Sequence, residues 1–193
     1  MELKDGQATF YAASRSAWRQ WLQEHGPTEK PIWLIIYRQE SQTPSVHFEE
    51  AIEEATCYGW VDSKARRRDG GSFYLRFTPR NPGSAWGKIS RERAEKMMRE
   101  GLMAPAGQAV IDASRQNGAW DALMDAQNLV IPDDLQSLFD QNESAFKNFQ
   151  AFSPSARRIL LEWIATARRP ETRRQRIEKT VQQAAQNLKA HTG

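Results

Sequence analysis

Apolar residues near the start of the chain follow two different periods. Between Ser14 and His25 they recur every three to four positions, which predicts a helix that Ser14 caps and Gly26-Pro27 ends. Residues 32–37 are apolar without interruption, which is typical of a short central strand that is buried on both faces. A second helix is expected over about residues 47–58.

The helix expected at residues 47–58 has two distinct sides. Its inward side is apolar, with Phe48, Ile52 and Ala55. Its outward side is acidic, with Glu49, Glu50, Glu53 and Glu54. Two pairs of these glutamates lie four positions apart and could hold a hard cation weakly. A solvated helix face explains them equally well, and we expect no metal.

Alternating residues predict a β-hairpin over residues 60–77, followed by a loop rich in proline and arginine. Asp69-Gly70 or Gly70-Gly71 is expected to supply the positive φ of a tight turn. Matching the apolar sides of the two strands places the other side chains on one common surface, provided that no bulge intervenes. That surface consists of Trp60, Asp62, Lys64, Arg66, Tyr74 and Arg76.

Beyond the hairpin the periodicity is helical, and it is interrupted by one stretch with little pattern. The chain of 193 residues can form one domain with a helical extension. We predict an α+β protein in which a small antiparallel sheet is packed by helices. The predicted parts are an α+β domain over residues 8–120, a connection over residues 121–132 and a helical region over residues 133–190.

Composition and charge narrow the classes of protein that fit. No apolar run approaches the roughly 18 residues of a membrane span. The first residues lack the features of a secretory signal, and the single cysteine, Cys57, cannot form an internal disulfide. We therefore expect a cytoplasmic protein.

The net charge of +3 is unevenly distributed along the chain. The consecutive segments 1–59, 60–96, 97–156 and 157–193 carry net charges of −4, +6, −5 and +6. Acidic segments that fold against basic ones would explain this pattern. A local positive field that attracts anions would explain it as well.

Three separated motifs follow one another along the middle of the chain. They are Pro44-Ser45-Val46-x-Phe48-x-Glu50-Ala51-x-x-x-Ala55-x-Cys57-Tyr58-Gly59-Trp60-Val61-Asp62, Arg76-Phe77-Thr78-Pro79-Arg80-x-x-x-Ser84-x-Trp86 and Glu100-Gly101-Leu102-Met103-x-Pro105-Ala106-Gly107. Together with the arginine-rich last helices, they resemble the YdeI/OmpD-associated family, which is also labelled as bacteriocin-protection proteins. The family is grouped with the YjbR/CyaY-like superfamily, which implies a small antiparallel sheet packed on helices. Gly87 and Ser90 depart from the family, which usually carries serine and often asparagine at these positions.

Seven residues in these motifs could line a ligand pocket. The guanidinium of Arg80 could bind a carboxylate or phosphate through two hydrogen bonds, with Trp60 or Trp86 stacked beside it. The full set is Glu50, Trp60, Asp62, Arg76, Arg80, Ser84 and Trp86. The alternative is structural, with Arg80 paired to Asp62 or Glu50 so that it locks the loop.

Cys57 is expected to be a buried small hydrophobe rather than a nucleophile. A catalytic thiol needs a base such as histidine, and none of His25, His47 and His191 falls at a motif position.

The resemblance implies an association with stress, and the candidate pocket favours a non-enzymatic binding protein that holds a small anionic or aromatic ligand and needs no cofactor. Three alternatives stay open. The arginine-rich C-terminal helices could bind a protein partner. The basic and aromatic residues of the hairpin could bind nucleic acid. Glu50 or Asp62 could act as a general base if its pKa were raised. No membrane partner is expected, and the sequence leaves the oligomeric state open.

Overall fold

The computed structural model describes residues 2–26 and 30–188. The chain divides into two compact units, each with its own core. The first unit comprises residues 1–84 and 89–117, and the second comprises residues 85–88 and 118–193. Each unit is described by itself below.

The first unit combines a sheet with helices, which confirms the predicted α+β class. The strands follow the order β1-β2-β3-β5-β4 across the sheet. The elements are β1 (Leu3–Lys4), β2 (Gln7–Tyr11), α1 (Arg15–His25), β3 (Ile32–Tyr37), α2 (Phe48–Cys57), β4 (Trp60–Arg67), β5 (Ser72–Pro79), α3 (Lys88–Arg99) and α4 (Pro105–Gln116).

The sheet is mixed, whereas the sequence predicted an antiparallel one. Strands β2 and β3 run parallel, with Thr9 opposite Trp33, and the other strand pairs are antiparallel. Two parallel neighbours need a crossover connection, which α1 provides between β2 and β3. The N-terminal strand β2, which the hydrophobic pattern did not predict, is therefore the reason for the difference.

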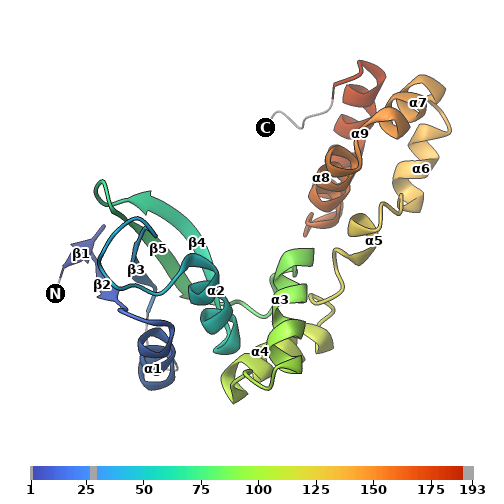
Figure 1. Ribbon diagram of the computed structural model, residues 1–193. Coiled ribbons are helices and arrows are strands. Elements are labelled where there is room, and N and C mark those ends of the chain that lie inside the picture. Colours follow the sequence, from blue (N-terminus) through green and yellow to red (C-terminus); the bar gives the residue numbers. More distant parts are fainter. Residues whose placement is uncertain (1, 27–29, 189–193) are drawn as a thin grey trace. The chain divides into compact units, whose positions relative to one another are not determined.

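Helices α1 and α2 cover one face of this sheet (Figure 1). Ser14 caps α1 as predicted, since its Oγ accepts a hydrogen bond from the N–H of Ala17 at 3.2 Å. Trp18 and Leu22 from α1 are fully buried against Leu34 of β3 and Phe77 of β5. The apolar stripe of α1 and the apolar residues of β3 thus pack together in one core.

Two residues of α2 lie on the side opposite to the predicted one. Glu54 was expected to face solvent, but it is only 2% exposed and accepts hydrogen bonds from Arg15 Nε and Arg19 Nη1, both at 2.6 Å. Phe48 was expected to face inward, but it is 41% exposed. Ile52, in contrast, is buried as predicted. The two arginines of α1 allow a carboxylate to be buried, because they supply the charge and donors that it would lose from water.

The turn between β4 and β5 also differs from the prediction. It spans Arg68 to Gly71, and neither Gly70 nor Gly71 has a positive φ. Instead, Asp69 Oδ1 accepts hydrogen bonds from the N–H groups of Gly71 and Ser72, both at 2.8 Å. In a four-residue connection the aspartate side chain can shape the turn by itself, so no left-handed glycine is required.

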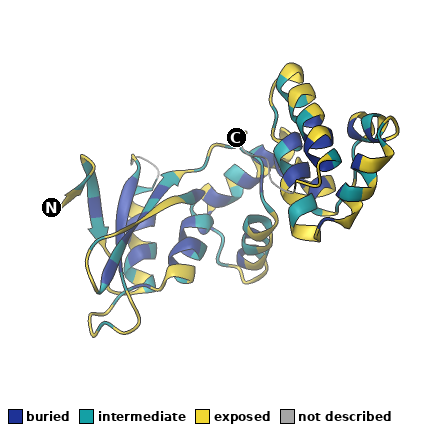
Figure 2. Ribbon diagram, turned by 90° about the horizontal axis from the view of Figure 1, so that it is seen from above, coloured by how far each residue is buried: buried dark blue, intermediate teal, exposed yellow. Residues whose placement is uncertain are grey.

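The second unit is helical, as predicted for the C-terminal region. Its helices are α5 (Met124–Gln127), α6 (Asp133–Phe139), α7 (Glu143–Ala151), α8 (Pro154–Ala165) and α9 (Pro170–Ala185). The core consists of one apolar side of each helix, visible as dark blue in Figure 2, with Phe139, Phe149 and Leu160 no more than 2% exposed. Short α5 lies within the stretch predicted as a connection. Across the described residues of both units, no helix combines the length and the apolar character needed to cross a membrane.

Candidate functional site

Trp60 lies in the core of the first unit. It is 3% exposed, and its ring meets the ring of Trp21 edge-on with 6.0 Å between the centroids. The same cluster contains Phe77 of β5 and the helix residues that cover the sheet. Trp60 therefore contributes to packing, and its ring does not face an open surface.

A β-bulge separates the residues that were predicted to share one surface of the hairpin. The register shifts between Asp62 and Lys64, so that Asp62 lies opposite Phe77 and Lys64 lies opposite Arg76. Side chains opposite each other in neighbouring strands point to the same face, so Asp62 is directed toward the helix-covered face and Lys64 away from it. The predicted common surface is wrong for Trp60 and Asp62.

Arg76 lies on the other face of the sheet, where no helix of the first core packs. It is opposite Trp33 in β3, and its Nε donates a hydrogen bond to Gln7 Oε1 at 3.0 Å. The aromatic residues Trp33 and Tyr74 form a smaller cluster on this face. Arg76 is therefore separated from Trp60 and Asp62 by the thickness of the sheet.

Arg80 and Ser84 lie in a loop that is fixed at several points. The N–H of Arg80 donates to the carbonyl of Gly59 at 2.9 Å, and the N–H of Ser84 donates to the carbonyl of Asn81 at 2.9 Å. Ser114 Oγ of α4 donates to the carbonyl of Pro82 at 3.1 Å. Burial lowers the pKa of the Arg80 guanidinium to about 10, which leaves it charged near neutral pH.

The structural alternative for Arg80 required an ion pair with Glu50 or Asp62. Glu50 instead accepts a hydrogen bond from the N–H of His47 at 3.1 Å, which fixes the start of α2. Among the described residues, neither Glu50 nor Asp62 forms an ion pair. Trp86, the seventh predicted residue, belongs to the second unit, where its ring packs on Trp120 with 4.8 Å between the centroids. Ligand roles for the single residues stay predictions.

Cys57 and the glutamates of α2, which the sequence singled out, have structural roles. Cys57 is fully buried, and burial raises the pKa of its thiol to about 11. On the acidic helix α2, Glu49 pairs with Arg93 and Glu53 pairs with Lys96, at 3.1 and 2.6 Å. Within the described ranges, no cluster of three or more His, Cys, Asp or Glu side chains could hold a metal ion.

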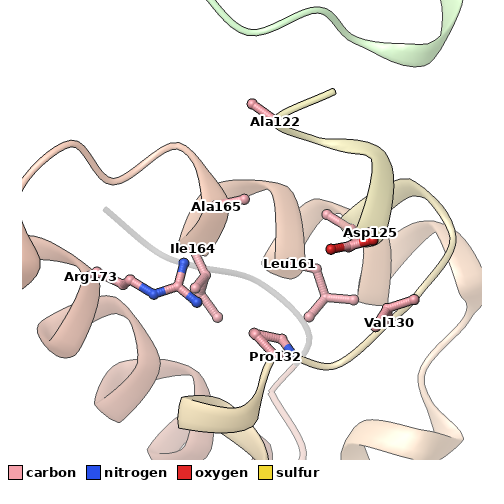
Figure 3. A pocket seen from close by; sticks show the side chains of 9 residues that line it. Ala122, Asp125, Val130, Pro132, Leu161, Ile164, Ala165 and Arg173 are labelled. Carbon is pink, nitrogen blue, oxygen red and sulfur yellow. The ribbon is translucent and has the colours of Figure 1, made fainter. Parts of the chain in front are cut away.

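A cavity that the sequence did not predict lies in the second unit (Figure 3). We call it the helical pocket. Its volume is about 200 Å³, and it lies between α5, the segment that follows it, α8 and the first turn of α9. It is lined by Ala122, Asp125, Ala126, Val130, Pro132, Leu161, Ile164, Ala165 and Arg173.

The helical pocket has an apolar middle and two charged side chains. Figure 3 shows Asp125 and Arg173 on opposite sides, with Leu161, Ile164 and Pro132 between them. Arg173 is held in place by Asp134, which accepts hydrogen bonds from Nε at 2.6 Å and from Nη2 at 2.9 Å. These hydrogen bonds lower the pKa of the Asp134 carboxyl. The carboxylate of Asp125 has no hydrogen-bond or ion-pair partner among the described residues.

The residues of the helical pocket carry only a weak signal in the sequence. Leu161 and Ile164 belong to an apolar stripe of α8, which has the pattern of any core-facing helix. The cavity exists because the small side chains of Ala122, Ala126 and Ala165 leave space between helices. Whether small residues on different helices meet depends on how the helices cross, which local periodicity does not encode.

Two family models match different parts of the chain. Residues 10–110, most of the first unit, match a domain of unknown function (DUF8412). Residues 128–187 match the family described as bacteriocin-protection, YdeI or OmpD-associated. The YdeI match thus falls on the helical C-terminal region, whereas the motifs between Pro44 and Gly107 fall largely within the other match. Neither a curated protein nor a solved structure matches the chain.

The two matches differ in length and in the part of the chain that they cover. The DUF8412 match covers more than half of the chain, and the other match covers every helix from α6 to α9. The chain therefore belongs to the DUF8412 family, and its C-terminal helices match the YdeI/OmpD-associated family of bacteriocin-protection proteins.

Proposed function

We propose that this protein is a binding protein whose helical pocket holds a small, mainly apolar ligand. The observation that carries the proposal is the cavity of about 200 Å³ between α5, α8 and α9 (Figure 3). A cavity of about 150 Å³ can hold benzene, whereas pockets for drug-sized ligands begin near 300 Å³. The volume therefore suits one aromatic ring with one or two small substituents.

The two charged residues of the helical pocket indicate which substituents fit. Arg173 uses Nε and Nη2 for Asp134, which leaves Nη1 available to an acceptor on the ligand. Asp125 can accept hydrogen bonds from a donor, and an amine is the strongest such donor. Because the two groups lie on opposite sides of an apolar middle, we propose a ring that carries an acceptor at one end and an amine at the other.

The same observations favour recognition over catalysis. Arg173 is held in place by Asp134, so the helical pocket presents one fixed guanidinium and one carboxylate rather than a nucleophile beside a base. The description of the matching family refers to bacteriocin protection, which agrees with a stress-associated role. Most of the residues that line the pocket, from Val130 to Arg173, lie within the part of the chain that this family model covers, whereas Asp125 precedes it.

A series of three probes tests the proposal. Isothermal calorimetry and NMR titration with 4-(aminomethyl)benzoate, benzoate and benzylamine should give the tightest binding for the first, with Kd of about 1 mM or lower. Ala165→Phe should abolish binding, because Ala165 lines the pocket and a phenyl ring would fill it. The matched control is Ala151→Phe, at an exposed position that ends α7, which should bind as the unchanged protein does.

Two results would contradict this function. The first is an absence of chemical-shift changes at Asp125, Leu161 and Arg173 with all three probes at saturating concentration. The second is unchanged affinity in a folded Ala165→Phe variant. In either case the helical pocket would be a packing defect rather than a binding site.

A second candidate function has support from the surface of α8 and the loop that follows it. Arg158, Arg168 and Arg169 are exposed, and none of them has a side-chain partner among the described residues. Ile159, next to Arg158, is 51% exposed. An exposed apolar residue among free arginines is typical of a protein-binding surface, and an acidic partner would match its charge. Partner binding that persists in Ala165→Phe would separate this function from ligand binding.

A further inference from the structure

Three consecutive residues of the segment that leads from β3 into α2 are held by hydrogen bonds or burial. The carbonyl of Pro44 accepts a hydrogen bond from the hydroxyl of Tyr11. Ser45 Oγ accepts one from the N–H of Tyr37 at 3.0 Å. Val46 is fully buried and its N–H donates to the carbonyl of Ala12 at 3.1 Å. These contacts account for the first half of the Pro44–Glu50 motif as structure.

Phe48 is the exception in this motif. Its side chain is 41% exposed at the first turn of α2, an unusual exposure for a large apolar ring in a motif in which Val46 is fully buried. Its ring lies 6.4 Å from the ring of Phe73 on β5, which is itself only partly buried. Two neighbouring phenylalanines that keep part of their rings in water form an apolar patch at the edge of the first core.

A hollow of about 270 Å³ opens beside these two rings. We call it the Phe48 hollow. It is lined by Ile36, Tyr37, Arg38, Gln39, Glu40, His47, Phe48 and Phe73. All of these residues belong to the first unit, so the hollow is independent of the helical pocket.

The hollow lies at the carboxyl end of β3, where the chain leaves the sheet. Strands β2 and β3 are the parallel pair, and they end at Tyr11 and Tyr37, whose rings touch edge-on with 5.6 Å between the centroids. The loop that leaves β3 supplies Arg38, Gln39 and Glu40 to the lining.

The charges of the lining favour an anion over a cation. Arg38 is exposed, and its guanidinium has no partner among the described residues, since its hydrogen bonds to Gly71 and Ser41 are made by the backbone N–H and carbonyl. His47 is a second basic side chain in the lining, against one acidic side chain, Glu40. A guanidinium binds a carboxylate through two hydrogen bonds, and phenylalanine rings pack on the face or edge of another ring.

We infer that the Phe48 hollow is a second binding site, for a small planar aromatic carboxylate. The ring of the ligand lies against Phe48 and Phe73, and its carboxylate binds Arg38. This site does not depend on the proposed function of the helical pocket, because the two cavities share no residue.

Titration with indole-3-acetate and with tryptamine, which carries an amine in place of the carboxylate, tests the inference. In NMR spectra of the full chain, indole-3-acetate should shift the resonances of Arg38, His47, Phe48 and Phe73 with Kd of about 1 mM or lower. Tryptamine should bind at least about fivefold more weakly, because Arg38 repels its amine. Arg38→Ala should remove this preference.

Phe48→Ala supplies the decisive comparison. Since Phe48 is 41% exposed, the variant should fold, and it should lose about tenfold in affinity for indole-3-acetate. Met124→Ala, at a similarly exposed apolar position (42%) in the second unit, is the matched control and should bind normally. Ala165→Phe should also bind normally, so a failed helical pocket and a failed Phe48 hollow can be told apart. Equal affinity for tryptamine, or unchanged affinity in Phe48→Ala, would overturn the inference.

Discussion

The thiol of Cys57 shows how burial of one side chain affects stability. Its pKa rises from an ordinary 9.0 to about 11, because burial disfavours the thiolate. The stabilising contribution of the neutral thiol is complete below about pH 9 and is lost as the pH rises through 11. Between about pH 8 and 11 the free energy of unfolding should therefore fall by about 2 kcal/mol more in the unchanged protein than in Cys57→Ala. Urea denaturation at both pH values measures this difference.

A thiol-reactive dye provides a second measurement of the same burial. At about pH 8 the folded protein should react far more slowly than the protein unfolded in urea, because Cys57 is both buried and protonated. Equal rates in the two states would show that the thiol is accessible. Equal pH dependence in the unchanged protein and Cys57→Ala would show that its pKa is not raised.

At the scale of residues, burial could be predicted where it follows from the spacing of apolar residues within one helix. Trp18, Leu22 and Cys57 lie on apolar stripes, and all three are buried. Glu54 was misplaced because its position depends on Arg15 and Arg19, which lie 39 and 35 residues away in the chain. The pattern of apolar and polar residues within α2 therefore does not reveal that Glu54 pairs with these two arginines.

At the scale of elements, strands β4 and β5 could be predicted from alternation, but their register could not. A bulge adds one residue to a strand, and the position between Asp62 and Lys64 has no glycine or proline to mark it. That single residue decides whether Trp60 faces the core or the opposite side of the sheet. The seven predicted site residues therefore do not lie on one surface, although the structure contains the predicted helix and strands that carry several of them.

The packing of α4 on the end of α2 depends on the absence of a side chain at Gly107. A Cβ atom at this position would lie 2.2 Å from the carbonyl oxygen of Cys57 and 2.6 Å from Met103 Sδ. The carbonyl belongs to the backbone at the end of α2, and it also accepts a hydrogen bond from the N–H of Ala104 at 3.1 Å. Gly107→Ala should therefore push the two helices apart and lower the free energy of unfolding by about 2 kcal/mol or more.

Chemical denaturation of Gly107→Ala should be compared with that of Gly70→Ala. A Cβ atom at Gly70 would meet no atom within 4 Å, and the residue has no positive φ. Its replacement should change the free energy of unfolding by no more than about 0.5 kcal/mol. Equal stability of the two variants would mean that α4 does not approach α2 as closely as the structure shows.

At the scale of the whole molecule, the α+β class and the helical C-terminal region could be predicted, because each depends on long periodic segments. The helical pocket could not, because it is made by small residues on separate helices. The two cores share no residue: one surrounds Phe77, and the other surrounds Phe149. Separate cores favour separate unfolding transitions, because residues unfold cooperatively only when they lose shared contacts together.

Calorimetry should resolve two unfolding transitions, one for each core. Phe77 and Phe149 are both fully buried, so Phe77→Leu and Phe149→Leu should each cost at least about 1 kcal/mol. A loss of this size lowers the Tm of a unit the size of the second one by roughly 4–8 °C, and that of the larger first unit by less. Each substitution should shift only the transition of its own unit, because the contacts that it weakens belong to one core. A single transition that both substitutions lower equally would show instead that the two units unfold as one cooperative body.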